Sequence, residues 1–315
     1  MKEDFCIFSG SAHRELAEEI CALRGVPLSS SITRHFHNDN LYVQLQETVR
    51  ERDVFIVQPF YPPPVSDRVL ELLLMLDAAR SASAKRVTAV IPYYSYSRSD
   101  KKDEPRISIA GRLIADLLAT AGAQRILTMT LHTPQVHGFF SVPTDHLNSM
   151  PVLASYFRDK DVTDTVVVTP DIGHAKRATE LARELKLPVA AISKKRISDS
   201  EVVAEGLIGD VHNKKVILID DEIAAGTSMI EAIKLLRQHG VTQATLVCTH
   251  GIFCGPAVQN LAAVPEIKAI VTTNTISIPP EKRIKDMQVL SVAPLFAEAI
   301  RRVHEGETMQ PLFEY

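Results

Sequence analysis

Tryptophan is absent from this 315-residue chain, and the four cysteines form no Cys-x-x-Cys pair. Their spacing matches no usual zinc pattern, and a chain of this length needs no disulfides, so we expect reduced thiols. The longest strongly apolar run, Val69 to Leu76, contains Glu71 and falls well short of the ~20 residues that cross a bilayer. The first residues carry acids where a secretory signal has basic residues. We therefore expect a cytoplasmic protein with no membrane partner.

An excess of charge of one sign is also lacking. The 35 Lys and Arg residues nearly balance the 38 Asp and Glu residues, for a formal net charge of −3. Such a chain has no global basic field for nucleic acid, so we expect no nucleic-acid partner, and any anion site must be local. Its composition, 45% hydrophobic and 23% charged, is typical of a globular protein, and its length suggests about two domains.

Short apolar runs alternate along the chain with segments of helical periodicity. The expected strands are 54–57, 86–92, 125–131, 166–169, 189–192, 216–219 and 244–249, and the expected helices are 67–80, 107–121, 175–187 and 227–238. Strands that are apolar on both faces and separated by helices are typical of parallel sheets covered on both sides. A weak echo between the segments that begin at Lys85 and Lys214 indicates two related α/β halves. We expect domains over residues 1–149 and 150–315.

Two adjacent acids and a turn of small residues follow the expected strand 216–219. Asp220 and Asp221 can accept hydrogen bonds from vicinal ribose hydroxyls or hold magnesium water. The small residues let backbone N–H groups ring a phosphate at the start of the next helix, where hydroxyls add donors. The residues expected at this site are Asp220, Asp221, Ala224, Ala225, Gly226, Thr227 and Ser228. The segment predicts a site for a phosphorylated polyol, and the structural alternative is a strand followed by a helix that Thr227 caps.

This segment resembles the phosphoribosyl-pyrophosphate motif of phosphoribosyltransferases and ribose-phosphate diphosphokinases. Further segments occur in the order seen in the diphosphokinase family: Ile91–Lys102, Leu131–Phe140, Thr169–Gly173, Lys194–Arg196 and Ala297–Glu305. The resemblance covers nearly the whole chain. It implies an α/β fold with two phosphoribosyltransferase-like domains, each a mainly parallel sheet flanked by helices, of which the first binds ATP and the second binds ribose phosphate.

The resemblance also implies a reaction, in which the β,γ-diphosphate of Mg-ATP passes to the anomeric hydroxyl of ribose 5-phosphate and AMP is released. The ATP-binding residues that it implies are Phe36, Asn38, Asn40, Arg98, Ser99, Asp100, Lys101 and His132, and the catalytic ones are Lys194, Arg196, Arg98 and His132. It adds Asp171 to the ribose-phosphate site and makes His132 and Asp171 ligands of Mg²⁺. The family's dimer-based assemblies, up to hexamers, imply a homo-oligomer.

The sequence departs from the family pattern at ligand positions. Asn38 and Asn40 stand where the family has an aspartate and a glutamate, and Thr130 and Ser141 replace two further acids. The sugar-phosphate loop is one residue shorter than usual. Two alternatives therefore stay open beside ribose 5-phosphate: a larger acceptor such as ADP-ribose, and a regulatory subunit that has lost turnover.

Overall fold

The computed structural model describes residues 4–196 and 202–313, without the side chains of 194–196 and 202–205. The chain divides into two compact units. The first comprises residues 4–148, 275–277 and 292–313, and the second comprises residues 149–274 and 278–291. The division after residue 148 lies one residue from the expected boundary. The C-terminal segment, however, belongs to the first unit.

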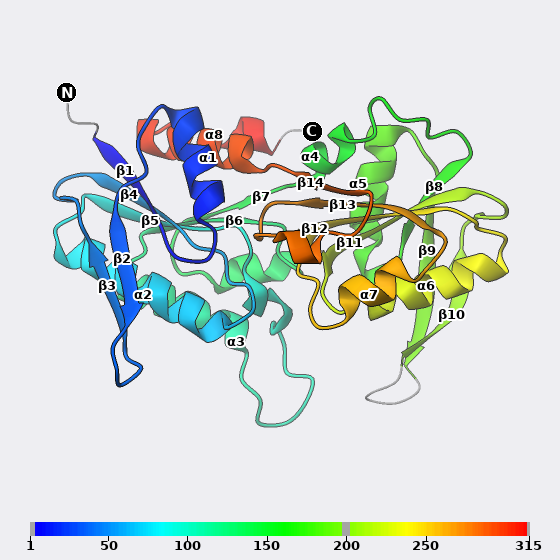
Figure 1. Ribbon diagram of the computed structural model, residues 1–315, viewed down its shortest axis with the longest axis horizontal. Coiled ribbons are helices and arrows are strands. Elements are labelled where there is room, and N and C mark those ends of the chain that lie inside the picture. The colour runs from blue at the N-terminus through cyan, green and yellow to red at the C-terminus, as the bar shows by residue number, and fades with distance from the viewer. Residues whose placement is uncertain (1–3, 197–201, 314–315) are drawn as a thin grey trace. The chain divides into compact units, whose positions relative to one another are not determined.

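The first unit is a parallel sheet covered by helices on both faces (Figure 1). Its strand order is β1 (Phe5–Ser9), β4 (Asp53–Val57), β5 (Arg86–Ile91), β6 (Arg125–Met129) and β7 (Thr144–Leu147). Helices α1 (Arg14–Arg24) and α8 (Ala293–Glu305) cover one face, and α2 (Val65–Ser81) and α3 (Ala110–Ala121) cover the other. An antiparallel hairpin of β2 (Ser31–His35) and β3 (Leu41–Leu45) follows α1, and short 3₁₀ turns span Ser95–Arg98, Pro134–Phe139 and Gln310–Leu312. Alternation along each strand sends its apolar side chains to both cores, as a two-sided parallel sheet requires.

The second unit is a larger sheet of the same design. Its strand order is β10 (Val202–Ile208), β9 (Val189–Arg196), β8 (Thr165–Thr169), β11 (Lys215–Ile223), β12 (Ala244–Gly251), β13 (Ile267–Thr273) and β14 (Met287–Leu290). Only the edge strand β10 is antiparallel to its neighbour among these described strands. Helices α4 (Met150–Ser155) and α5 (Ala175–Leu185) pack on one face, and α6 (Thr227–Gln238) and α7 (Ala257–Ala262) pack on the other. Two 3₁₀ turns, Ile172–His174 and Pro280–Lys282, lie in its loops.

The expected fold class is confirmed, since both units are mainly parallel sheets flanked by helices. The helix 227–238 has the predicted bounds. The helix expected over 107–121 begins three residues later, where the Ser99 hydroxyl accepts the N–H of Ala110 at 3.1 Å. The helix expected over 175–187 ends at Leu185, because Lys186 adopts a left-handed conformation two residues before Pro188.

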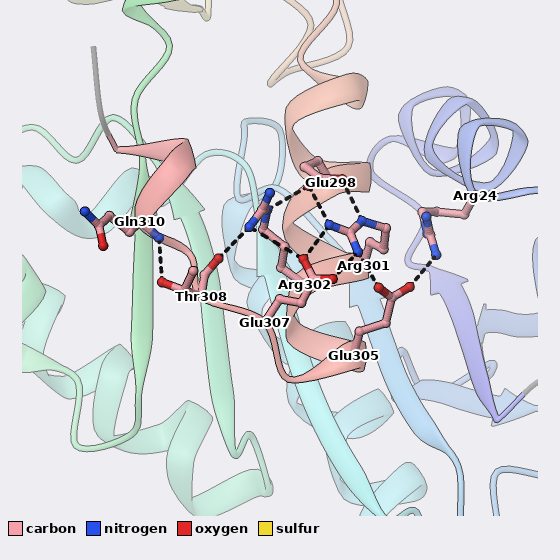
Figure 2. A network of polar contacts seen from close by, with 8 residues as sticks. All are labelled: Arg24, Glu298, Arg301, Arg302, Glu305, Glu307, Thr308 and Gln310. Carbon is pink, nitrogen blue, oxygen red and sulfur yellow. Dashed lines mark hydrogen bonds and ion pairs between the residues drawn. The ribbon is translucent and has the colours of Figure 1, made fainter.

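Helix α8 explains why the second domain does not run to the C-terminus. Its residues Phe296 and Ile300 are fully buried in the core that α1 shares with the first sheet, and Figure 1 shows the two helices side by side. Its polar side carries an ion-pair network in which Arg301 meets Glu298, Glu305 and Glu307 (Figure 2). The apolar face of α8 thus requires the first unit. Within the described part of the chain, every helix is too short or too polar to span a bilayer.

Candidate functional site

The turn between β11 and α6 has the form expected of an anion site. Gly226 stands directly before the helix with a φ of 76°, a left-handed conformation that glycine adopts without strain. The N-cap residue Gly226 has no side chain with which to cap α6, so the first N–H groups of the helix keep their capacity to bind a ligand. Thr227 is the first residue of the helix, and the alternative in which its hydroxyl caps this helix is therefore wrong. Ala225, Thr227 and Ser228 are exposed.

The two adjacent acids lie within β11, because the strand runs four residues beyond its expected end at Ile219. Asp221 is buried, with 2% of its surface exposed. The Asp220 side chain is 16% exposed, and its Oδ1 lies 3.1 Å from Nδ1 of His174. The same oxygen accepts the backbone N–H of Asp221 at 2.9 Å. The neighbours are therefore unequal, with one carboxylate inside the unit and the other near its surface.

The pKa values of Asp220 and His174 are both raised above their ordinary values. Burial raises the pKa of Asp220, in opposition to the hydrogen bond with His174, and the adjacent Asp221 charge raises it further. The hydrogen bond to Asp220 raises the pKa of His174, although burial of the ring works against this. Each group therefore holds its proton to a higher pH than it would in isolation, and such perturbed groups are common where charged ligands bind.

Asp171 lies in the turn after β8 and is exposed. Its Oδ1 accepts the N–H of Gly173 at 2.7 Å, and its backbone carbonyl accepts the N–H of His174 at 3.0 Å. Asp171 thus caps the 3₁₀ turn Ile172–His174 rather than α5 itself. Since a carboxylate has two oxygens, this cap leaves Oδ2 for a ligand.

In the first unit, Phe36 occupies the tip of the β2–β3 hairpin with 47% of its surface exposed. Its ring packs against Tyr42 at a centroid distance of 5.4 Å, and the Arg34 guanidinium lies over both rings. Asn38 and Asn40 are exposed on the same tip, where Asn38 Oδ1 accepts the N–H of Asn40 at 3.3 Å. The structure thus brings the three predicted base-binding residues together on one exposed hairpin.

The loop after β5 carries four further ATP-binding candidates. Arg98 ends the 3₁₀ turn Ser95–Arg98 and is exposed, while Ser99 is held by its contact to the start of α3. Asp100 accepts a hydrogen bond from the Thr133 hydroxyl at 2.8 Å, which ties this loop to the segment that contains His132. Lys101 is exposed and pairs with Asp103 at 3.4 Å.

The segment around His132 follows β6. The N–H of His132 lies 3.4 Å from the Ser97 hydroxyl, and its side chain is half-buried. Thr130, one of the residues that replaces a family acid, has a φ of 45° and is buried. A positive φ is uncommon for a residue other than glycine, and residues in this conformation are often found at binding sites.

Two catalytic candidates, Lys194 and Arg196, have side chains outside the described residues. Their backbones lie in β9, which pairs with β10.

His174 is the site residue that sequence reasoning missed. It lies in the turn that follows β8, immediately before α5. Strand β11 is the parallel neighbour of β8, so the carboxyl ends of the two strands lie at the same edge of the sheet. Side chains at such ends meet, so a histidine three residues after Asp171 was a usable signal.

The family models and the relatives that match this chain agree with one another. Residues 5–122 match the family model for the N-terminal domain of ribose phosphate pyrophosphokinase, and residues 201–314 match the phosphoribosyl synthetase-associated domain. The ribose-phosphate pyrophosphokinase of Deinococcus radiodurans is 52% identical, over 98% of this chain and 97% of its own length. That of Clostridium acetobutylicum is 45% identical, over 98% of this chain and 97% of its own.

A solved structure has the same fold throughout. The crystal structure of phosphoribosylpyrophosphate synthetase from Mycobacterium smegmatis superposes with a TM-score of 0.90 at 39% identity. The match covers 96% of this chain and 100% of that structure.

Proposed function

Because this chain belongs to the ribose-phosphate pyrophosphokinase family, it is an enzyme of that type, and we propose that it transfers the β,γ-diphosphate of Mg-ATP to the anomeric hydroxyl of ribose 5-phosphate. The products are phosphoribosyl pyrophosphate and AMP. One observation supports this proposal above the others: the uncapped helix α6 follows a strand that carries two acids. That arrangement offers N–H groups to a phosphate and carboxylates to the hydroxyls of the same sugar.

The proposed acceptor site lies wholly in the second unit. The 5-phosphate binds at the turn of Ala224, Ala225 and Gly226, with the hydroxyls of Thr227 and Ser228 as further donors. Asp220 and Asp221 hold the ribose hydroxyls. The short, left-handed turn suits this task because a backbone without bulky side chains lets successive N–H groups approach one phosphate.

The proposed nucleotide residues belong to the first unit. Phe36 offers its exposed ring to adenine, and Asn38 and Asn40 offer amides that both donate and accept. The polyphosphate is assigned to the loop after β5 and to His132. The residues of this loop in the proposal are Arg98, Ser99, Asp100 and Lys101.

The chemistry leaves the protein little covalent work, since the anomeric oxygen attacks the β-phosphorus and AMP departs. Positioning and neutralisation of charge therefore dominate the barrier. We assign these tasks to Lys194 and Arg196, a point charge and a planar fork that both suit phosphate oxygens, together with Arg98 and His132.

Magnesium is part of the proposal. Mg²⁺ prefers oxygen ligands and keeps several waters, and the exposed Asp171 carboxylate, with Oδ1 occupied by Gly173, fits one contact through Oδ2. The imidazole of His132 suits this ion less, and it is the weaker part of the proposed ligand pair. When bound, the ion would neutralise charge on the β- and γ-phosphates.

The test incubates purified protein with ATP, Mg²⁺ and either ribose 5-phosphate or ADP-ribose, and follows AMP and the diphosphorylated product by mass. We expect product from ribose 5-phosphate. Product from ADP-ribose alone would mean that ADP-ribose, and not ribose 5-phosphate, is the acceptor. No product from either compound would favour the regulatory subunit.

Two variants test the catalytic assignment. Lys194→Ala and Arg196→Ala should each lower turnover about 100-fold or more, the scale of removing one group that stabilises the transition state. Lys268→Ala, which removes an exposed lysine from β13, is the matched control and should keep the wild-type rate. An unchanged rate in both test variants would reject the assignment.

The homo-oligomer and the cytoplasmic location stay predictions. Gel filtration with light scattering measures the first directly.

A further inference from the structure

His174 reaches a substrate-binding acid from a neighbouring strand connection. It ends the 3₁₀ turn after β8, whereas Asp220 lies in the adjacent strand β11, 46 positions further along the chain. A carboxylate can only accept, so the imidazole Nδ1–H donates to Asp220 Oδ1. Both side chains are largely buried, with 20% of His174 and 16% of Asp220 exposed.

The two oxygens of Asp220 have different surroundings. Oδ1 receives two donors, Nδ1 of His174 at 3.1 Å and the backbone N–H of Asp221 at 2.9 Å. Neither of these two donors bonds to Oδ2, and the Asp221 side chain also lies within hydrogen-bonding reach of the Asp220 carboxyl group. Two bonds to one oxygen fix the rotation of the carboxyl group, and the second oxygen keeps its lone pairs for an incoming hydroxyl.

Several hydrogen bonds hold the turn that carries His174. The carboxylate of Asp171 accepts the N–H of Gly173, and its carbonyl accepts both the N–H of His174 and the hydroxyl of Thr169. These bonds aim the imidazole across the strand ends.

We propose that His174 is a positioning residue, which fixes the Asp220 carboxylate so that Oδ2 faces the hydroxyls of a phosphorylated ribose. This inference rests on the proposed function, since it assigns the acceptor site of that reaction. A preset carboxylate binds a vicinal diol without first losing rotational freedom, and this advantage disappears when the donor is removed.

Two substitutions separate the donor from the bulk of the ring. In asparagine the amide nitrogen occupies the place of Nδ1, two bonds from Cβ, whereas in glutamine it occupies the place of Nε2. His174→Asn therefore keeps the bond to Asp220 and His174→Gln loses it. His239→Ala, an exposed histidine that ends α6, is the control for histidine loss.

The measurement is equilibrium binding of ribose 5-phosphate by calorimetry, with the Michaelis constants for both substrates and a melting curve for each variant. We expect His174→Gln to weaken ribose 5-phosphate binding about tenfold, the effect of one charge-assisted hydrogen bond, with no change in KM for ATP. His174→Asn should lie within about threefold of the wild type, and the control should match it.

Equal binding by the asparagine and glutamine variants, both folded, would overturn the inference. So would a loss of ATP affinity equal to the loss for the sugar phosphate. A wild type that binds ribose 5-phosphate but yields no product would instead count against the proposed function alone, because the binding measurement does not require turnover.

Discussion

Replacing Gly226 by alanine adds one methyl group where the β11–α6 turn enters its helix. The added Cβ would lie 3.1 Å from Cγ of Leu261 and 3.2 Å from its Cδ2. Leu261 is fully buried in α7, so it cannot move aside freely. The φ of 76° adds a second cost, because an L-residue is strained in the left-handed region.

The two costs can be estimated separately. Left-handed backbone costs an alanine roughly 1–2 kcal/mol, and pressing a methyl group into a packed core costs roughly 1–3 kcal/mol. We therefore expect Gly226→Ala to lose about 2–5 kcal/mol, which for a domain of this size lowers the melting temperature by roughly 4–20 °C. The displaced N–H groups of α6 should also raise KM for ribose 5-phosphate at least about tenfold.

A matched control isolates the contact with Leu261. Gly306 follows α8 with a φ of 71°, and nothing lies within 4 Å of a Cβ added there. Gly306→Ala should therefore show only the backbone cost, about 1–2 kcal/mol, and an unchanged KM. The reasoning is refuted if both variants lose the same stability, or if Gly226→Ala binds the acceptor as the wild type does.

Three shorter predictions concern other parts of the chain. The Arg301 hydrogen bonds lower the pKa of Glu298 to about 2. The ionised Glu298 therefore stabilises the folded protein fully above its ordinary pKa of 4.5, and this contribution is lost as the pH falls toward 2. The difference in free energy of urea unfolding between wild type and Glu298→Gln should close over that pH range. Burial raises the pKa of the Cys248 thiol from 9.0 to about 12, so iodoacetamide at pH 8 should alkylate it about a thousandfold more slowly in the folded protein than in urea. Asp53→Asn removes the buried charge that pairs with Arg86 and His304. It should lower the free energy of urea unfolding by about 2 kcal/mol, less than for a wholly buried pair because the Arg86 side chain is 32% exposed. The control His212→Ala, at an exposed position, should leave the free energy of unfolding unchanged.

Local pattern was sufficient for the elements that bury both faces. The run 216–219 and the periodicity of 227–238 each reflect burial that neighbouring residues decide, and the structure has both. The hairpin of β2 and β3 escaped prediction because its residues are half-exposed and, among the described strands, pair only with each other, which leaves a weak alternation. Sequence reasoning placed Phe36 at a binding site through family resemblance, without the hairpin that presents it.

Long-range packing limited the rest. The sequence of helix α8 predicts an apolar face but does not indicate which of the two sheets that face covers. In the structure the chain returns to the first unit, where the apolar face of α8 is buried. Asp53 ties the end of this helix to β4 by accepting from Nδ1 of His304 at 2.7 Å. Such a contact joins residues 251 positions apart, so no local window contains it.

The adjacent acids of β11 show the same limit inside the site. As letters, Asp220 and Asp221 are equivalent, and one role for both was the natural prediction. In the structure, Asp221 is buried and gives its N–H to Asp220, whose Oδ1 also receives His174. One acid thus helps to orient the other, and the orientation depends on a histidine from a different strand connection. Substitution of His174 and of Asp220 should therefore affect the same binding constant, and their effects should not add, because residues that act through one carboxylate are coupled.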